Sequence, residues 1–309
     1  MVFPGPVSRL LALGVVVACT IGGLSTAVAV EGPATDATGS SGSSGQAGEA
    51  PGAAEVPGWT AGMDVSYWQG EAETIDWSEA VERGARFTYI KASEGSYGGT
   101  SDRYVAQRKA AAAHGLYTGA YHFANPSAHY ASGATQARLF AEYSVAWNAP
   151  FADLPLAGEK LLPPMVDLEW NPYPEDGNAC YDRTPAEMVD WIHDFVDTAT
   201  LLFGRPPVIY TNTSWWRLCT GDSAEFTESP LSLADWSTDK QGGPGVLPAG
   251  WSTWTFWQHG DAALDYTPAE SLLPGDQQYF NGSLAELGRF ASTPSEAHHS
   301  TREISTPAR

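Results

Sequence analysis

Positive charge is scarce in this chain, which has 16 Lys and Arg against 36 Asp and Glu in 309 residues and a net charge of −20. Bulk charge therefore cannot hold the protein on nucleic acid or anionic lipid. The same argument excludes electrostatic attraction to an anionic cell wall, so a wall polymer would have to be bound in a specific groove. Acidity also keeps an exported protein soluble and by itself assigns no function.

Histidine is also rare, with 7 residues, and none shows metal-ligand spacing such as His-Glu-x-x-His. We therefore expect neither a metal nor a cofactor. His298 and His299 are neighbours in a polar tail and are expected at the surface. His122 follows Tyr121 in a strand pattern, so the two side chains should face opposite ways, with His122 packed behind the sheet.

Apolar runs long enough to cross a membrane are missing, because Leu10 to Ala18 is far too short to span a bilayer. This run follows Arg9 and precedes Ala27-Val28-Ala29, a small-x-small cleavage site. The pattern predicts a secretory signal peptide over residues 1–29. A cut before Cys19, as in bacterial lipoproteins, is the alternative and would anchor the protein to a membrane. Without it we expect an extracellular protein with no membrane attachment.

Cysteine is nearly absent, with 3 residues, one of which, Cys19, leaves with the signal peptide. The remaining pair, Cys180 and Cys219, is even in number and destined for an oxidising compartment. We expect a disulfide that closes a loop of about 40 residues and stabilises the fold by roughly 3–4 kcal/mol in the chain-entropy model. Two unpaired buried thiols are the alternative.

Composition divides the chain into four parts. Residues 30–57 are mostly Gly, Ser, Ala and Pro and should form a disordered linker, because they cannot bury enough apolar surface to fold. Residues 292–309 are similarly polar and are expected to form a disordered tail. Between them, residues 58–291 contain the alternating apolar patterns of one folded domain.

Strand-like and helix-like segments alternate within this domain. Strands are predicted at 61–65, 87–91, 116–123, 164–169, 207–211, 231–235, 253–258 and 277–280. The first five are each followed by a helical pattern, with capping boxes at 76–79 and 184–187 and further helices from about 101 to 115 and 132 to 147. Such alternation predicts a parallel sheet, and about eight strands in roughly 230 residues suit a closed barrel. After Thr211 the helical pattern thins, so the barrel is expected to lose its last helices.

The most informative segment is the short strand PPMVDLEW at 163–170. Because strand side chains alternate, Asp167 and Glu169 point the same way while Val166 and Leu168 pack behind them. Two adjacent acids push their pKa values apart, and this gives one protonated acid and one carboxylate, as a glycosidase requires. An acidic strand end that caps a helix or pairs with Arg is the structural alternative.

Other acids, amides and aromatic residues collect at the predicted strand ends, where the active sites of barrel enzymes lie. Asp64, Glu94 and Asp276 would join Asp167 and Glu169 at one rim, where strong mutual repulsion makes a purely structural role improbable. Sugars bind by stacking on aromatic rings, with polar groups holding their hydroxyls. The candidate substrate-binding residues are Trp68, Glu94, Tyr121, Tyr210, Trp236 and Gln258, whereas Trp77, Trp147 and Trp191 have helical spacing and are assigned to the core.

Eight motifs, in order along the chain, resemble those of the glycoside hydrolase family 25 lysozymes, the Chalaropsis-type N-acetylmuramidases. They are GMDVSYWQG (62–70), IDW (75–77), IKASEG (90–95), GAYHF (119–123), DLE (167–169), IYTN (209–212), WQ (257–258) and DQQYFNG (276–282). The resemblance covers about Trp59 to Phe290, which is essentially the whole folded part.

The resemblance implies an α/β, TIM-barrel-like fold, a flattened (β/α)5(β)3 barrel in a single catalytic domain. It also implies hydrolysis of the β-1,4 bond between N-acetylmuramic acid and N-acetylglucosamine in peptidoglycan, by a protein expected to be a monomer. Glu169 would be the general acid and later the general base, and Asp167 would orient and polarise the reacting group. Asp64 and Asp276 would complete the acidic cluster. The nucleophile, a carboxylate or the substrate's own acetamide, stays open.

One motif departs from the family pattern. Family members usually carry Leu-Trp-x-Ala-x-Tyr on the sixth strand, where this chain has LSLADW at 231–236, so Ser232 removes one aromatic surface. Two other functions were weighed. A chitinase-like hydrolase would show Asp-x-Asp-x-Glu, but Met165 stands where the first Asp should be. An inactive wall-binding module should lack one of the acids, and none is missing.

Overall fold

A computed structural model describes residues 58–96, 101–144, 160–236, 242–261 and 273–292 of the chain. The signal peptide, the linker and nearly all of the predicted tail lie outside these ranges, as do Trp147, His298 and His299, so their assignments stay predictions. In the described part, no helix combines the length and apolar character needed to cross a membrane.

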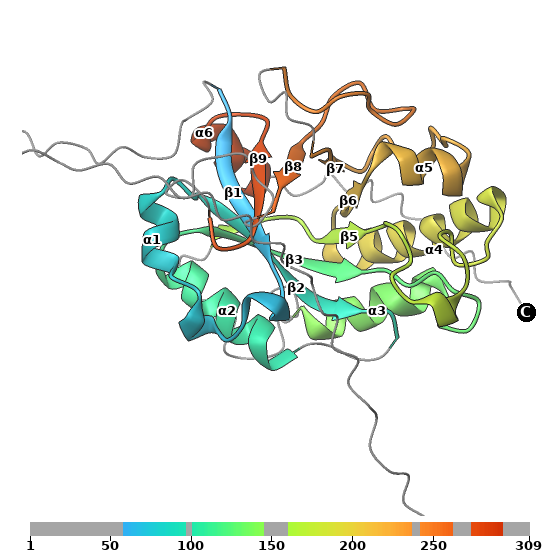
Figure 1. Cartoon of the computed structure of the whole chain (residues 1–309), viewed down its shortest axis with the longest axis horizontal. Helices are drawn as coiled ribbons and strands as arrows, with labels where there is room; N and C mark the ends of the chain where they lie inside the picture. The colour runs from blue at the N-terminus through green and yellow to red at the C-terminus, as the bar shows by residue number, and fades with distance from the viewer. Residues whose placement is uncertain (1–57, 97–100, 145–159, 237–241, 262–272, 293–309) are drawn as a thin grey trace, which may run out of the picture. The chain divides into compact units, whose positions relative to one another are not determined.

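The described residues form a sheet of nine strands in the order β2-β1-β9-β8-β7-β6-β5-β3-β4. Because β2 also pairs with β3, eight of the strands close into a barrel (Figure 1). The bounds are β1 Thr60–Val65, β2 Phe87–Glu94, β3 Tyr117–Phe123, β4 Lys160–Leu161, β5 Met165–Asp167, β6 Val208–Thr211, β7 Leu231–Ala234, β8 Phe256–Gly260 and β9 Asp276–Phe280. The closed α/β barrel in a single domain is therefore confirmed, and β4 is a two-residue addition beside β3.

The last strand differs from the predicted parallel sheet. β9 runs antiparallel to both of its neighbours, β1 and β8. A parallel neighbour needs a crossover connection, usually a helix, whereas an antiparallel strand can return directly along its partner. Since β9 starts where β8 ends, its first residue, Asp276, lies at the same rim as the carboxyl ends of the other strands.

Within the described ranges, five helices follow the early strands, and a sixth follows β9 (Figure 1). Of the two predicted capping boxes, the one formed by Thr184 and Glu187 is present. At 76–79 only half of the box forms: the Asp76 carboxylate accepts from the Glu79 amide, while the Glu79 carboxylate bonds Arg83. The helix after β9 was not predicted. The helices are α1 Trp77–Glu82, α2 Ser101–Ala113, α3 Gly133–Tyr143, α4 Pro185–Phe203, α5 Thr213–Thr220 and α6 Leu284–Ser292, with short 3-10 turns at Tyr67–Gln69, Ala72–Thr74 and Pro174–Asp176.

Apolar side chains fill two layers. The larger layer lies between the strands and the surrounding helices and contains Trp77 and Trp191, as predicted. His122 belongs to this side as well: it is fully buried and stacks on Phe195. The second layer fills the barrel and is closed by Leu287 and Phe290 of α6. There a Cβ at Gly119 would lie 2.3 Å from the Tyr89 ring, so only glycine leaves room for the tyrosine.

The predicted disulfide joins Cys180, in the loop after β5, to Cys219 in α5, with 5.3 Å between the two Cα atoms. Other contacts tie down the same loop: the Trp215 indole donates to the Ala179 carbonyl, and the Asn171 amide donates to the Gly177 carbonyl. The segment that follows β5 is therefore fixed to the helical layer.

Removing this bridge should mainly lower stability. For the double variant Cys180→Ala/Cys219→Ala we expect a loss of about 3–4 kcal/mol, since the unfolded chain regains the freedom of a loop of about 40 residues. In a domain of this size that corresponds to a decrease in Tm of roughly 10 °C. Scanning calorimetry of the oxidised wild type and the variant measures it, and equal melting temperatures would contradict the stabilising role.

Candidate active site

The acids at the rim are placed by strand alternation and register. On β1, Gly62 and Asp64 face the barrel interior, and on β9, Asp276 and Gln278 do the same, because Asp64 is the direct cross-strand partner of Asp276. Like charges directly opposite each other on antiparallel strands are destabilising. The pair must therefore be neutralised in part, either by a shared proton or by hydrogen-bond donors.

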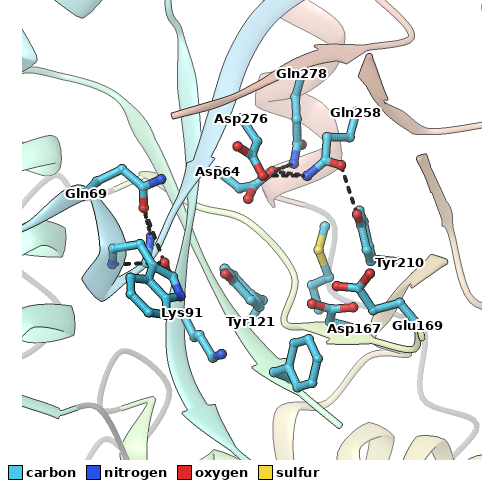
Figure 2. A pocket seen from close by; sticks show the side chains of 14 residues that line it. Asp64, Gln69, Lys91, Tyr121, Asp167, Glu169, Tyr210, Gln258, Asp276 and Gln278 are labelled. Carbon is cyan, nitrogen blue, oxygen red and sulfur yellow. Dashed lines mark hydrogen bonds between the residues drawn. The ribbon is translucent and has the colours of Figure 1, made fainter. Parts of the chain in front are cut away.

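The second pair of acids comes from β5. Asp167 ends this strand opposite Tyr210 of β6, and Glu169 lies two residues beyond the strand end. Figure 2 shows the Glu169 carboxylate above Asp167 and beside the Tyr210 ring, with Asp64 and Asp276 across the cavity. The shared face predicted for Asp167 and Glu169 is thus observed, although the strand is shorter than expected.

These residues surround a cavity of about 300 Å³. It is lined by all four predicted catalytic acids and by four of the predicted substrate-binding residues: Trp68, Tyr121, Tyr210 and Gln258. Trp68 is the most open of them, with 77% of its surface exposed. Glu94 and Trp236 do not line this cavity, and each instead contacts a residue that does.

Glu94 reaches the site through a lysine. A register shift in β2 between Lys91 and Ser93 brings Lys91 and Glu94 together, and the Lys91 ammonium lies 2.6 Å from the Glu94 carboxylate. The Tyr173 hydroxyl, on the disulfide-linked loop, donates to the other Glu94 oxygen. Lys91 is the cation in the cavity lining, it is 8% exposed, and it also lies over the Phe123 ring.

Trp236 reaches the site through an amide. Its indole nitrogen donates to the Gln258 side-chain oxygen at 3.0 Å, and the Tyr210 hydroxyl donates to the same oxygen at 2.8 Å. The Gln258 side-chain nitrogen faces Asp64 at 2.9 Å and Asp276 at 3.3 Å. Since Gln258 is only 3% exposed and its side chain is occupied on both sides, it acts on its neighbours more than on a sugar.

Several lining residues were quoted in the motifs without a role, and Lys91 and Gln278 are the two that contact the predicted acids most directly. Lys91 was overlooked because a lysine in a strand pattern usually marks a solvated face, whereas here it projects into the barrel. Gln278 could have been found from the alternation on the last strand, since it shares a face with Asp276 and lies two residues away. Its side-chain nitrogen donates to Asp64.

Burial dominates the electrostatics of the acids. Loss of hydration, with smaller contributions from neighbouring carboxylates, raises the pKa of Glu169 to about 7 and that of Asp276 to about 8. Burial likewise raises the pKa of Asp64 to about 6, although hydrogen bonds from Gln258 and Gln278 act against this rise. The pKa of Asp167 lies well above its ordinary value because of burial and the adjacent Glu169. A protonated acid and a carboxylate can therefore coexist here near neutral pH.

The raised pKa values predict that stability falls as pH rises from about 6.5 to 8. In this window the folded protein holds protons on Glu169 and Asp276 that the unfolded chain has already released, so alkalinity favours unfolding. Burial lowers the pKa of His122 to about 4. This histidine makes stability rise with pH only below its ordinary pKa near 6.5, where the unfolded chain still holds the proton, so it does not affect the window from about 6.5 to 8. Thermal unfolding at a series of pH values tests the trend, and a Tm that increases over this window would contradict it.

A deep cavity with four clustered acids and several aromatic rings suits acid–base cleavage of a glycosidic bond. In the described residues no group of three or more His, Cys, Asp and Glu side chains has a geometry that could hold a metal ion. The prediction that no metal or cofactor takes part stays a prediction.

Comparison with known proteins agrees with this chemistry. The family model "Glycosyl hydrolases family 25" matches residues 63–265. "Lysozyme M1" of Streptomyces globisporus is 36% identical over 239 residues, which cover 76% of this chain and 72% of that protein. The "N,O-diacetylmuramidase" of Chalaropsis sp. is 36% identical over 238 residues, covering 75% of this chain and 98% of that protein.

A solved structure shows the same fold. The family GH25 lysozyme from Aspergillus fumigatus superposes with a TM-score of 0.64 and is 34% identical, over 76% of this chain and all of that protein. The matched family model covers most of the described barrel, from β1 to just beyond β8. The chain is a member of glycosyl hydrolase family 25.

Proposed function

We propose that this protein is a secreted lysozyme that cleaves the β-1,4 bond between N-acetylmuramic acid and N-acetylglucosamine in peptidoglycan. The observation that carries the proposal is the pair Asp167 and Glu169, which lie side by side in a cavity that also contains Asp64 and Asp276. Family membership makes the chain a glycoside hydrolase, and relatives named muramidases support this substrate class.

In this mechanism Glu169 holds a proton and donates it to the leaving oxygen. Burial supports this role because it raises the pKa of Glu169 to about 7, close to working pH. The same residue then accepts a proton from the attacking water, as microscopic reversibility requires.

Asp167 would position the reacting sugar. One of its carboxylate oxygens, Oδ1, is buried and has no hydrogen-bond partner within the described part of the chain. An unpaired buried acceptor is costly unless a ligand fills it. An acetamide N–H of the substrate is a suitable donor, and an acetamide held in this way could itself attack the anomeric carbon.

Aromatic side chains would hold the glycan. Tyr121 and Tyr210 lie in the cavity wall, and Trp68 and Trp236 expose large ring surfaces beside it, with 77% and 43% of their areas open. Sugar rings stack on such surfaces through their apolar faces. Glu94 would contribute through Lys91, and Ser232, which is fully buried inside the sheet, adds no ring surface.

Product analysis of the full mature chain tests the bond that is cut. Insoluble peptidoglycan is digested, and the soluble fragments are reduced with borohydride and identified by mass spectrometry. Reduced muramic acid ends are expected. Reduced glucosamine ends would instead indicate a chitinase-like or glucosaminidase specificity, and binding without any release of fragments would indicate an inactive wall-binding module.

The remaining assignments follow from this function. Peptidoglycan glycan strands are the proposed partner. The protein would bind them outside the cell after removal of residues 1–29 or, if Cys19 is lipidated, at the membrane surface. Nucleic acid is not an expected partner because of the net charge of −20. We further propose that the protein acts as a monomer.

A further inference from the structure

The amide groups of Gln258 and Gln278 converge on one of the four acids, Asp64, and Gln258 also faces Asp276. Gln258 of β8 and Gln278 of β9 are direct cross-strand partners, and Gln278 is the partner of Gly62, two residues from Asp64. Their side-chain nitrogens both face the same oxygen of Asp64, Oδ2. Figure 2 shows the two amides meeting at this carboxylate.

The orientation of the Gln258 amide is fixed by its other neighbours. An indole N–H can only donate, so the group that receives the Trp236 nitrogen at 3.0 Å must be the Gln258 oxygen. The Tyr210 hydroxyl donates to this oxygen too. The Gln258 nitrogen therefore has to face Asp64 and Asp276, because a rotated amide would place a donor against the Trp236 indole and an acceptor against the two carboxyl groups.

From this arrangement we propose that Gln258 and Gln278 are positioning residues that keep Asp64 as the ionised member of the cluster, so that its negative charge retains the proton on Glu169. The proposal rests on the acid role proposed for Glu169. Two N–H donors on one oxygen favour its charged form, and the negative charge so fixed disfavours ionisation of the acids that face it.

The surroundings of Asp64 support this assignment. The charged and titratable groups that face it are Asp276 on β9, Lys91 on β2, Tyr121 on β3, Asp167 and Glu169 at the end of β5, and Tyr210 on β6. Lys91 is paired with Glu94 at 2.6 Å, so the amides are the donors aimed directly at Asp64. Consistently, burial raises the pKa of Asp64 only to about 6, and the Asp64 charge is the second cause, after burial, that raises the pKa of Glu169.

Gln258 also connects the cluster to the glycan-binding surface. Its oxygen receives both Tyr210, in the cavity wall, and Trp236, on the exposed rim. A sugar stacked on Trp236 would therefore affect the position of the Gln258 amide, which also hydrogen-bonds to Asp64. Gln278 lacks such a link: within the described residues, its buried side-chain oxygen has no hydrogen-bond partner. The two glutamines are thus a matched pair: both donate to Asp64, but only Gln258 is also linked to the glycan-binding surface.

The experiment compares Gln258→Met with Gln278→Met, which keep an unbranched side chain of similar length and remove the amide. Full-length protein is labelled with ¹³C at the aspartate carboxyls, and Asp64 is assigned from the loss of its signal in Asp64→Asn. We expect Asp64 to titrate lowest of the three site aspartates in the wild type, and about one pH unit or more higher in each variant. The Trp236 indole ¹⁵N signal, assigned with Trp236→Phe, should move only in Gln258→Met.

Enzyme kinetics add a second readout. Both variants should show a narrower pH profile for kcat, because Asp64 ionises later and Glu169 loses its proton earlier, and only Gln258→Met should also raise KM. Unchanged Asp64 titration in both folded variants would overturn the proposal. If Gln258→Met does not fold, Gln278→Met alone decides it. The titration needs no substrate, so it tests the proposal for Asp64 even if the protein proves not to be a lysozyme. Conversely, an unchanged Asp64 titration would leave the product analysis of the lysozyme function unaffected.

Discussion

Glu169→Gln should reduce the release of soluble glycan fragments by at least about 10³-fold. The substitution keeps the shape and volume of the side chain and removes only the proton that the leaving oxygen needs, and general acid–base catalysis contributes about 10²–10⁴-fold in enzymes. Because the same group serves in both chemical steps, the loss should lie at the upper end of this range. Initial rates of reducing-end formation from peptidoglycan measure it.

The Glu169→Gln variant should keep the fold, and at alkaline pH it should be more stable than the wild type. The amide cannot ionise, so the variant escapes the cost of a buried carboxylate beside Asp167 and Asp64. We expect a Tm equal to or above that of the wild type between pH 6.5 and 8, together with unchanged binding to insoluble peptidoglycan. Substantial activity in a well-folded variant would refute the assignment of Glu169 as the acid.

Asp167→Asn is expected to lower kcat by roughly 10²–10³-fold, which is less complete than the loss at Glu169. An asparagine side chain has the same shape, but it cannot develop the negative charge that would strengthen the hydrogen bond from the substrate acetamide in the transition state, and charged hydrogen bonds contribute about 1.5–3 kcal/mol. A further part of the loss would come from the altered ionisation of Glu169, which lies beside Asp167. The effect should fall mainly on kcat, because the interaction strengthens in the transition state.

A buried acid outside the cavity provides the control. Asp176 is 3% exposed, accepts from the Asn125 amide and does not line the cavity. Asp176→Asn should therefore lower stability, because the Asn125 amide loses its acidic acceptor, but the folded fraction should keep its kcat. Retained activity in Asp167→Asn would make Asp167 a purely structural residue, and equal losses in both variants would point to a general effect of removing a buried carboxylate.

Sequence patterns predicted most of the barrel because its strands and helices obey local rules. Alternation put Asp167 and Glu169 on one face, positions at strand ends brought Asp64 and Asp276 to the same rim, and the caps at Asp76 and Thr184 marked the starts of helices. These features depend on neighbours within a few residues. The direction of β9 and the formation of α6 depend on how the barrel closes, which a local pattern does not encode.

The site was predicted less completely for a similar reason. The irregular register in β2 brings Lys91 and Glu94 to the same side, although strict alternation puts residues three apart on opposite faces. The link from Trp236 to Asp64 through Gln258 joins three separate segments, so no spacing in the sequence reveals it. Residue types at strand ends identified the site, whereas the contacts between them required the structure.

The antiparallel last strand has a consequence for engineering. Thr60, at the start of β1, pairs with Phe280 at the end of β9, and the Thr60 hydroxyl also bonds the Gly282 carbonyl at 2.7 Å. The chain therefore enters β1 and leaves β9 at one place, on the face of the barrel opposite the rim that carries the acids. A targeting module fused directly ahead of β1 would therefore join the barrel on the side away from the cavity and leave that cavity open to a polymeric substrate.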